Sequence, residues 1–391
     1  MNRTQPISPD VFRYHRTGPT LRTAVTSHRS ITALILFAAV AACGGDAAPS
    51  TTTTTTAPTT TSTTSTTTTT TTLPPTTTTT LGAETTVTTF PAGFASPLNG
   101  LPAEDTLDLD RSVIAVKVDN HPGARPQSGL LDADAVVELL VEGGFSRFIA
   151  FFHDNESDLI GPIRSLRPTD STLVLPTGAP LFMSGGQPWV QNLTVARGQR
   201  ILGESAGMFR SSLHAAPHNL YGRTETLRSR ADARGYTNNE PMPLLPVDDW
   251  DYPDEVASEV ELRWSDNNVV TWSYFPDKRT YGRWTNGSRH YVQDEDREQT
   301  QVEAEVLVIL VGDVYTAYPP ADGTPVPATD TVGSGEAWVF ARGRMWHGSW
   351  HRDDIDEPFT LSAQDGTPAV VPAGFPWISF FPTGHTITVD G

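Results

Sequence analysis

A long stretch of threonine, proline and serine from about residue 47 to residue 90 divides this chain of 391 residues into two unlike parts. The stretch offers almost no apolar surface, so folding could not compensate for the entropy lost on ordering it. Its prolines favour an extended backbone, and about 45 residues in that form would reach on the order of 140 Å. We therefore expect residues 43–92 to form a disordered tether and only residues 95–391 to fold.

A short apolar run precedes the only cysteine of the chain. It extends from Ile31 to Ala42 and is shorter than the roughly 20 residues that cross a bilayer, so it is typical of an export signal. Val40-Ala41-Ala42-Cys43 resembles the bacterial lipobox, in which the protease cuts before the cysteine and the sulfur takes diacylglycerol. The alternative is an ordinary secretory signal with an incidental cysteine. We predict a signal peptide over residues 1–42 and a lipid on Cys43 that holds the chain to the cell membrane, on its extracytoplasmic face.

Charge and cysteine content exclude several classes of function. The net charge is −18, and the first 30 residues are basic, so the remainder is more acidic still. Such a body repels phosphate backbones, and nucleic acid is not an expected partner. With one cysteine, the chain forms neither an internal disulfide nor a thiolate zinc site. Nothing in the sequence indicates a cofactor.

Residues 95–391 have the pattern of an α+β protein, and their number exceeds what one core usually holds. We expect a mixed α/β N-terminal domain over residues 95–240 and a mostly β C-terminal domain over residues 258–391. A proline-rich and acidic connector is expected at 239–254. The predicted strands are 114–119, 135–142, 145–152, 179–183, 269–274, 306–311, 336–341, 345–351 and 377–381, and the predicted helices are 189–197 and 224–234.

The strands at 135–142 and 145–152 are expected to form a β-hairpin across Gly143-Gly144. A helix through 132–142 is the alternative, and the β-branched and aromatic residues favour the hairpin. A two-residue turn would pair Leu140 with Arg147 and Glu138 with Ile149, and would bring Arg147 to the face that carries Glu138 and Glu142.

Several segments resemble the YerB-like bacterial lipoprotein family, a family of unknown function with an N-terminal and a C-terminal domain. In the first half the resemblance rests on Ala115–Leu130, Val141–Arg147, Gly161–Arg167, Ser184-Gly-Gly and Ala216–Tyr221. In the second half it rests on Trp272-Ser-Tyr, Tyr281-Gly-Arg, Gly333–Trp338, Gly348–His351 and Pro372-Ala-Gly. The resemblance covers about 95–388 and implies a membrane-anchored extracytoplasmic protein with a two-domain α+β body. It implies no reaction.

Carboxylates and arginines gather in the segments of the first half. We predict a cluster in which planar guanidinium groups pair with carboxylates. Such a cluster either binds an anionic or polar ligand or is an internal ion-pair network that fixes loops. Its members would be Asp119, Arg125, Glu138, Glu142, Arg147, Arg164 and Arg167.

Three further patterns have two interpretations each. His214 and His218 are four apart, but Pro217 disfavours a helix between them, so a loop is expected rather than a metal site. In that loop His218 and Asn219 either orient the backbone or line the same cleft as the carboxylates and arginines. Ser184-Gly-Gly ahead of a helix is an anion seat or, more commonly, a structural turn. The tryptophans of the second half either form a sugar-stacking face or pack in the core, which is their commoner use; they are Trp272, Trp338, Trp346, Trp350 and Trp377.

Two hypotheses of function follow. The first is a non-catalytic binding or accessory protein of the envelope, whose partner is cell-wall polymer or another envelope protein. The second is a hydrolase or transferase of cell-wall polymer, with Asp119 or Glu142 as acid/base and the arginines holding an anionic substrate. An open cleft around these side chains would favour the second hypothesis, and burial in mutual salt bridges would favour the first.

Overall fold

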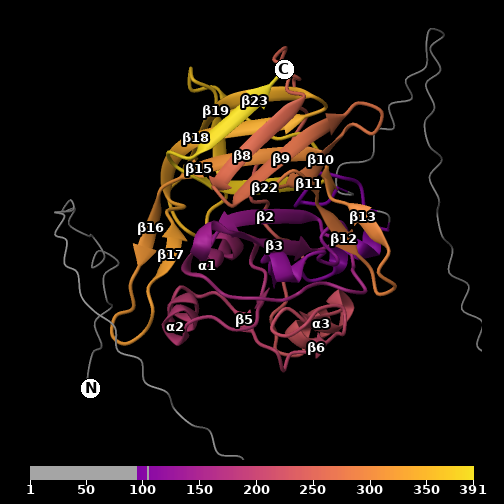
Figure 1. Ribbon diagram of the computed structural model, residues 1–391, viewed down its shortest axis with the longest axis vertical. Coiled ribbons are helices and arrows are strands. Elements are labelled where there is room, and N and C mark those ends of the chain that lie inside the picture. The colour runs from indigo at the N-terminus through magenta and orange to yellow at the C-terminus, as the bar shows by residue number, and fades with distance from the viewer. Residues whose placement is uncertain (1–94, 104) are drawn as a thin grey trace, which may run out of the picture. The chain divides into compact units, whose positions relative to one another are not determined.

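A mixed sheet of eleven strands organises the molecule (Figure 1). The computed structural model describes residues 95–103 and 105–391; the predicted signal peptide, Cys43 and the tether lie outside the described residues. The strand order is β21-β20-β19-β18-β15-β22-β2-β3-β1-β4-β5. The strands are β1 (Ile114–Val118), β2 (Ala135–Leu140), β3 (Ser146–Phe152), β4 (Leu181–Phe182), β5 (Ile201–Leu202), β15 (Val306–Gly312), β18 (Gly333–Ala341), β19 (Arg344–Arg352), β20 (Thr360–Ser362), β21 (Pro368–Ala369) and β22 (Pro376–Pro382).

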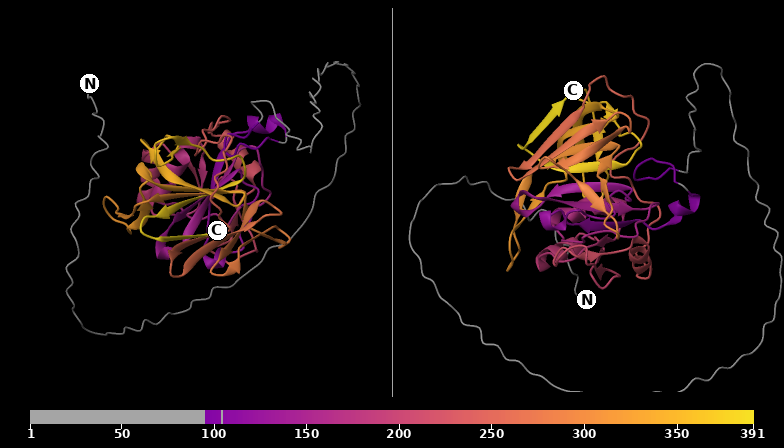
Figure 2. Two further views of the ribbon diagram at one scale, coloured as in Figure 1. Left: turned by 90° about the horizontal axis from the view of Figure 1, so that it is seen from above. Right: turned by 45° about the vertical axis from the view of Figure 1, so that its right-hand side comes forward.

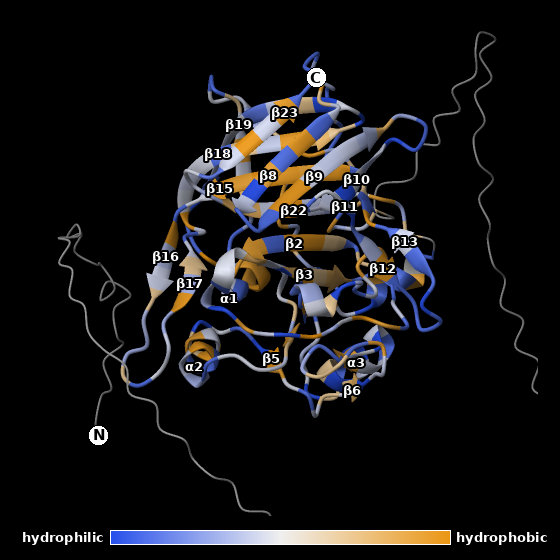
Figure 3. Ribbon diagram, viewed as in Figure 1, coloured by the Kyte–Doolittle hydropathy of each residue, from blue (hydrophilic) through white to orange (hydrophobic). Residues whose placement is uncertain are grey.

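The central strands of this sheet are buried on both faces, which explains their nearly continuous apolar sequences (Figure 3). One face packs against a second sheet and, in the first half, against a helix that contributes Leu227 and Ala231. The opposite face packs against two other helices and against Leu244 and Leu245 of the predicted connector. Two hydrophobic clusters, one on each side of the sheet, therefore stabilise the fold.

The remaining elements cover these faces or extend from the edges. The second sheet consists of β8 (Glu259–Ser265), β9 (Asn268–Phe275), β10 (Thr280–Thr285), β11 (Ser288–Arg289), β14 (Glu303–Ala304) and β23 (Thr386–Asp390). The helices are α1 (Pro168–Val174), α2 (Pro188–Ala196) and α3 (Thr224–Asp232). Three two-stranded ribbons are β6–β7 (Phe209–Arg210, Leu220–Tyr221), β12–β13 (Tyr291–Gln293, Gln299–Gln301) and β16–β17 (Val314–Ala317, Val326–Thr329). Short 3-10 turns occur at Thr106–Asp110, Pro122–Ala124, Glu142–Gly144 and Leu175–Thr177.

The two halves of the sequence meet inside the large sheet (Figure 2). β2 of the first half pairs in parallel with β22 of the second, from Val136 opposite Trp377 to Leu139 opposite Phe380. The β16–β17 ribbon reaches the first half, where the indole N–H of Trp189 donates to the carbonyl of Thr324. How far residues 95–240 and 258–391 would fold by themselves stays a prediction.

The β12–β13 ribbon makes a second contact of this kind. The backbone N–H of Gln293 donates to the carbonyl of Gln127 at 2.7 Å, and the guanidinium of Arg223 binds Glu295 at 2.6 Å. The second half therefore holds the first through two ribbons as well as through the shared sheet.

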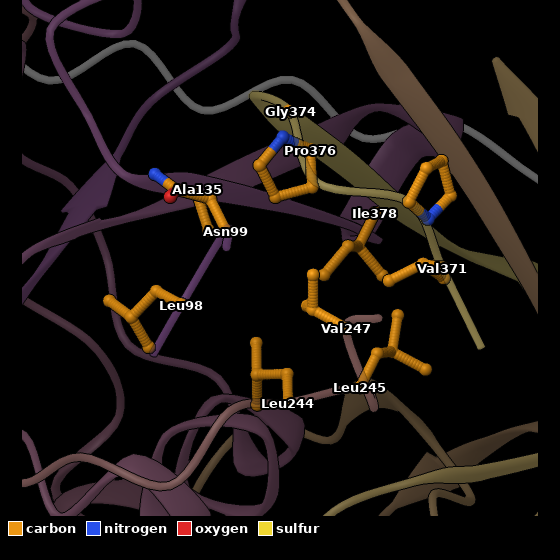
Figure 4. Close-up of a pocket in the computed structure, with 11 residues that line it drawn as sticks. Leu98, Asn99, Ala135, Leu244, Leu245, Val247, Val371, Gly374, Pro376 and Ile378 are labelled. Atoms are coloured by element: carbon orange, nitrogen blue, oxygen red, sulfur yellow. The ribbon is translucent and has the colours of Figure 1, made fainter. Parts of the chain in front are cut away.

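The predicted connector is packed, although its prolines suggest an exposed linker. Leu244 and Leu245 are 5% and 3% exposed. Figure 4 shows them, with Leu98 and Ile378, around an apolar recess. The recess has a volume of about 10 Å³, which leaves room for one water at most. The side chains around this recess join the start of the described chain, the connector and β22, and they leave no space for a ligand.

The α+β class is confirmed, and the C-terminal half is mostly β. The predicted hairpin also forms, but its predicted register is wrong. Leu139 lies opposite Arg147 and Glu138 opposite Phe148, one residue away from the prediction. The reason is the turn: Val141 N–H bonds Phe145 carbonyl, so the connection is longer than Gly143-Gly144 alone. A shift of one residue moves Arg147 to the face opposite Glu138.

Candidate functional site

Three strands of the first half run parallel and end at the same edge of the sheet. β1 pairs with β4 and β4 with β5, so that Val116, Phe182 and Leu202 are aligned. Asp119, Ser184 and Glu204 follow these strands directly or after one residue. The carboxyl ends of parallel strands are where open α/β sheets place ligands. We call the polar residues gathered here the strand-end cluster: Asp119, Glu142, Arg147, Arg164, Ser165, Arg167, Ser184, Glu204, Arg210, His218 and Asn219.

Asp119 is the buried centre of the strand-end cluster, with no exposed surface. Its Oδ1 accepts a hydrogen bond from Arg147 Nε at 2.9 Å, and its Oδ2 lies 2.8 Å from His218 Nδ1. Burial raises the pKa of Asp119, but the charge and hydrogen bond of Arg147 and the hydrogen bond of His218 outweigh burial and lower it. Asp119 is therefore a carboxylate at neutral pH and carries no proton for general acid catalysis.

From Asp119 a chain of contacts leads to the surface. Ser165 Oγ accepts hydrogen bonds from Arg147 Nη1 at 2.8 Å and from Arg167 Nη1 at 2.7 Å. Arg167 Nε and Nη2 both donate to Glu142 Oε2, at 2.8 and 2.6 Å. The Glu142 side chain is 41% exposed and lies at the outer end of this chain. Both predicted acid/base candidates are thus engaged by arginine.

A second chain of contacts crosses the ends of β4 and β5. Ser184 Oγ donates to Glu204 Oε1 at 2.6 Å, and Arg210 Nη2 donates to Glu204 Oε2 at 2.8 Å. Arg210 Nη1 also donates to Asn219 Oδ1 at 2.9 Å. Asn219 adjoins His218, so the two chains meet. Because Ser184 binds a carboxylate of the protein itself, it is a member of the network and has the environment of neither a nucleophile nor a vacant anion seat.

Two imidazole rings lie next to Asp119. The rings of His121 and His218 stack with centroids 4.7 Å apart and planes 3° apart. Burial and the neighbouring His218 lower the pKa of His121. His214 is not part of this pair, because its Nε2 lies 2.9 Å from the carbonyl oxygen of Pro126. The segment of the two predicted histidines is a loop, as expected from Pro217.

Arg164 is the one arginine of the strand-end cluster that makes no side-chain hydrogen bond or ion pair with the described residues. Ile163 bridges Val118 in antiparallel fashion, and Arg164 N–H donates to the carbonyl of Lys117 at 3.0 Å. Opposite residues of such a pair share a face, so Arg164 is on the face of Lys117 and Asp119. Lys117 is matched there by Asp170 at 2.7 Å. The half-buried Arg164 is therefore a cation without a partner among the described residues.

Glu138 and Arg125 lie apart from this network. Glu138 is fully buried and binds Arg283 of the second half through two hydrogen bonds of 2.8 Å. Arg125 donates to the side-chain and backbone oxygens of Asn120 at 2.8 and 2.9 Å, and burial, with the charge of Arg283, lowers its pKa to about 10. These two predicted members belong to the interior between the halves.

The remaining chemistry of the site is limited. Among residues 95–103 and 105–391, no group of three or more His, Cys, Asp or Glu side chains is arranged to hold a metal ion. The cations of the strand-end cluster outnumber its carboxylates. This favours a role in holding an anion over a role in transferring protons.

Sequence reasoning missed four members or neighbours of the site. Ser165, Glu204 and Arg210 complete the hydrogen-bond chains, and Arg283 neutralises Glu138. Ser165 lies inside the family segment Gly161–Arg167 and could have been found there. Glu204 and Arg210 carry no local signal, because β5 and β6 are only two residues long.

Comparisons with known proteins agree with this architecture. Residues 98–237 match the N-terminal domain, and residues 260–378 the C-terminal domain, of a family described as protein of unknown function DUF3048. The chain belongs to the DUF3048 family. Putative lipoprotein YerB of Bacillus subtilis (strain 168) is 27% identical over 284 residues, which cover 64% of this chain and 84% of YerB. The crystal structure of Bacillus subtilis YerB aligns with a TM-score of 0.64 at 24% identity, over 75% of this chain and 99% of that one, and so supports the DUF3048 fold.

Proposed function

We propose that this DUF3048 protein is a lipoprotein of the bacterial envelope that binds an anionic wall component at the strand-end cluster and catalyses no reaction. The membrane anchor is supported by the Val40–Cys43 motif and by the name of the relative from Bacillus subtilis. None of the described helices is long and apolar enough to cross a bilayer. A lipid on Cys43 would supply the attachment.

Membrane fractionation tests the anchor. We expect the wild-type protein in the membrane fraction and Cys43→Ser in the soluble fraction, with mass spectrometry of the amino-terminal peptide showing acyl chains on wild type alone. Equal solubility of the two proteins, without acylation of either, would refute the anchor and leave the proposed binding site untouched.

Anion binding is supported above all by Arg164, a half-buried guanidinium that has no partner in the described part of a strongly acidic protein. Neighbouring arginines are held in fixed positions by Ser165 and Glu142, so a ligand would meet oriented N–H groups. An unpaired guanidinium is suited to bidentate pairing with a carboxylate or phosphate. The engagement of Asp119 in two charge-assisted contacts argues for binding rather than acid/base work.

The binding test uses the soluble body, residues 92–391, and purified wall material. We expect salt-sensitive retention of the wild type and retention about tenfold weaker for Arg164→Met, because a hydrogen bond to a charged group contributes about 1.5–3 kcal/mol. The matched control is Arg289→Met, which removes an exposed arginine from β11. Equal retention of the Arg164→Met and Arg289→Met proteins would overturn the proposed site.

A second candidate function is the hydrolysis or transfer of wall polymer, and one observation favours it. Asp119 fixes the His218 ring through Nδ1, as an orienting carboxylate does for a general base, and the His218 side chain is 18% exposed. The base would then be His218 rather than the predicted Asp119 or Glu142. Release of soluble wall fragments by the wild type, lost in His218→Asn and retained in Glu142→Gln, would establish this function in place of simple binding.

A further inference from the structure

The second half contains a cavity of about 750 Å³ that shares no residue with the strand-end cluster. It is lined by the end of β15, the beginning of β18 and the turn between β22 and β23. β15 and β18 belong to the eleven-stranded sheet, whereas β23 is an edge strand of the second sheet. The cavity therefore opens where the two sheets part at one end, as ligand cavities do at the mouths of β-barrels.

Trp338 provides the aromatic surface of this cavity. It is one strand position from Ala337 and Val339, which face the opposite cluster, and it packs instead toward the core between the two sheets. His347 stacks on its ring with centroids 3.7 Å apart and planes 15° apart, which fixes the indole. The indole N–H is buried and has no hydrogen-bond partner in the described part of the chain. Trp338 therefore has a fixed ring and a hydrogen-bond donor that the described residues leave unused.

The rest of the lining combines apolar side chains, among them Val311 and Ile387, with polar side chains and glycines. Asp313, Asp330 and Glu336 supply hydrogen-bond acceptors. None of these three carboxylates forms an ion pair with an arginine or a lysine of the described chain. Burial and the charge of Asp313 raise the pKa of Asp330. A Cβ on Gly335 would lie 2.1 Å from the carbonyl oxygen of Val311, so that glycine lets two strands approach closely below the cavity.

We propose that this cavity binds a neutral carbohydrate. An aromatic plate beside carboxylate oxygens suits a sugar ring, whose C–H face packs on an indole while its hydroxyls donate hydrogen bonds. Glu336 lies 3.8 Å from His347 Nε2, and no arginine or lysine of the described chain pairs with Asp313 or Asp330. The lining therefore repels polyanions, and this ligand differs in charge from the ligand proposed for the strand-end cluster. The volume is within the range of small-molecule sites and has room for one or two sugar rings.

The test titrates the soluble body with the β-1,4-linked tetramer of N-acetylglucosamine and follows heat and tryptophan fluorescence. A lysine tetrapeptide and inorganic polyphosphate serve as charged probes. We expect the sugar to bind and polyphosphate not to compete. Trp338→Phe should weaken binding of the sugar about fivefold, within the range for loss of part of an aromatic contact. Trp284→Phe on β10, outside the cavity, is the matched control and should bind as the wild type does.

Charge variants separate the sugar from a cationic ligand without disturbing the core. Asp330→Asn keeps an oxygen acceptor and should change the affinity for the sugar less than twofold, as should Asp277→Asn in an exposed turn. Asp330→Ala removes the acceptor and should weaken binding several-fold. Preference for the lysine peptide, abolished in Asp330→Asn, would replace the carbohydrate by an ammonium ligand. Binding of no probe by a folded wild-type protein would overturn the proposal.

Discussion

Glu138 shows at the scale of one residue how the two halves depend on each other. Its carboxylate receives Arg283, the Ser146 hydroxyl at 2.5 Å and the Trp377 indole N–H at 2.8 Å, and both charged side chains are 0% exposed. The Arg283 guanidinium also lies 5.0 Å from the centre of the Trp377 ring. One buried anion therefore satisfies donors from both halves, and its removal leaves a buried cation unpaired.

We expect Glu138→Leu to lower the free energy of unfolding by about 3–5 kcal/mol, because Arg283 would stay buried without an anion. Urea denaturation at neutral pH measures the change. Glu261→Leu is the control, since its pair with Arg263 is exposed and should contribute less than about 1 kcal/mol. A double variant, Glu138→Leu with Arg283→Met, should be more stable than Glu138→Leu alone. If Glu138→Leu and Glu261→Leu lower the free energy of unfolding equally, the buried pair contributes no more to stability than the exposed one.

His290 is a second buried group at this junction. Its Nδ1 lies 2.9 Å from Thr285 Oγ1 and its Nε2 lies 2.9 Å from Gln127 Oε1. Burial, with the charges of Arg283 and Arg125, lowers the pKa of His290 well below its usual value. The folded state therefore holds His290 neutral at a pH at which the unfolded chain takes up a proton.

Because the unfolded state binds this proton first, stability falls as the pH drops below about 6.5. The loss from His290 at pH 5 is at most about 2 kcal/mol, the limit set by the ordinary histidine pKa of about 6.5 in the unfolded chain. His290→Gln removes the titration and keeps polar atoms in place. We expect the difference in unfolding free energy between pH 7 and pH 5 to be smaller in His290→Gln than in the wild type. Parallel pH profiles would contradict this assignment. Other titrating groups are common to both proteins and cancel in the comparison.

At the scale of elements, the turn between β2 and β3 decides the register of the hairpin and its contact with the second half. Gly144 has φ +75°, and a Cβ there would lie 2.6 Å from Ser265 Cβ and Oγ, at the end of β8. Gly287 also has φ +75°, in the turn before β11, but a Cβ there would meet nothing within 4 Å. The two glycines share the backbone conformation and differ only in surroundings.

Alanine at either position should lower stability by about 1 kcal/mol through the left-handed backbone. Gly144→Ala should cost a further 1–3 kcal/mol, roughly the cost of overpacking, because Ser265 must move. Thermal and urea unfolding of the two variants measure the difference. If Gly144→Ala and Gly287→Ala lower the free energy of unfolding equally, the contact between this turn and β8 contributes nothing to stability.

The elements that the sequence predicts well are those whose signal is local. β15, β18, β19 and β22 lie where alternating or continuous apolar runs indicate strands, and α2 and α3 follow helical patterns. α1 was missed because its helix, Pro168–Val174, has seven residues and β-branched side chains that favour strand. The register of β2 and β3 was missed because a Gly-Gly pair fits turns of more than one length.

The site was predictable in part for the same reason. Arginines and carboxylates in neighbouring segments indicated a carboxylate–guanidinium cluster, but not its pairs: Arg147 was expected beside Glu138 and Glu142, and it binds Asp119, while Arg167 binds Glu142. The partner of Glu138 was not predictable, because Arg283 lies 145 residues away and reaches it only through the packing of two sheets. Glu204 follows the short strand β5 and Arg210 lies in the short strand β6, and the positions of these strands depend on pairing with β4 and β7.

At the scale of the whole molecule, the sheet implies that the two family domains fold as one cooperative unit. β2 and β22 are neighbours in the middle of the sheet and are buried along nearly their whole length. Cutting the chain at the connector would expose both strand edges, the buried Glu138 and the apolar surface under Leu244 and Leu245. Neither fragment could satisfy these groups alone.

We therefore expect the fragments 95–255 and 256–391, expressed separately, to lack cooperative unfolding and to bind a hydrophobic dye. Mixed, or produced together, they should restore one sharp transition with a urea dependence close to that of the intact body, because that slope follows the surface exposed on unfolding. Each fragment unfolding sharply by itself would make the β2–β22 contact a docking surface between independent domains. The same outcome would make the Glu138–Arg283 pair an interface contact, and its removal would then separate two folded domains without unfolding either of them.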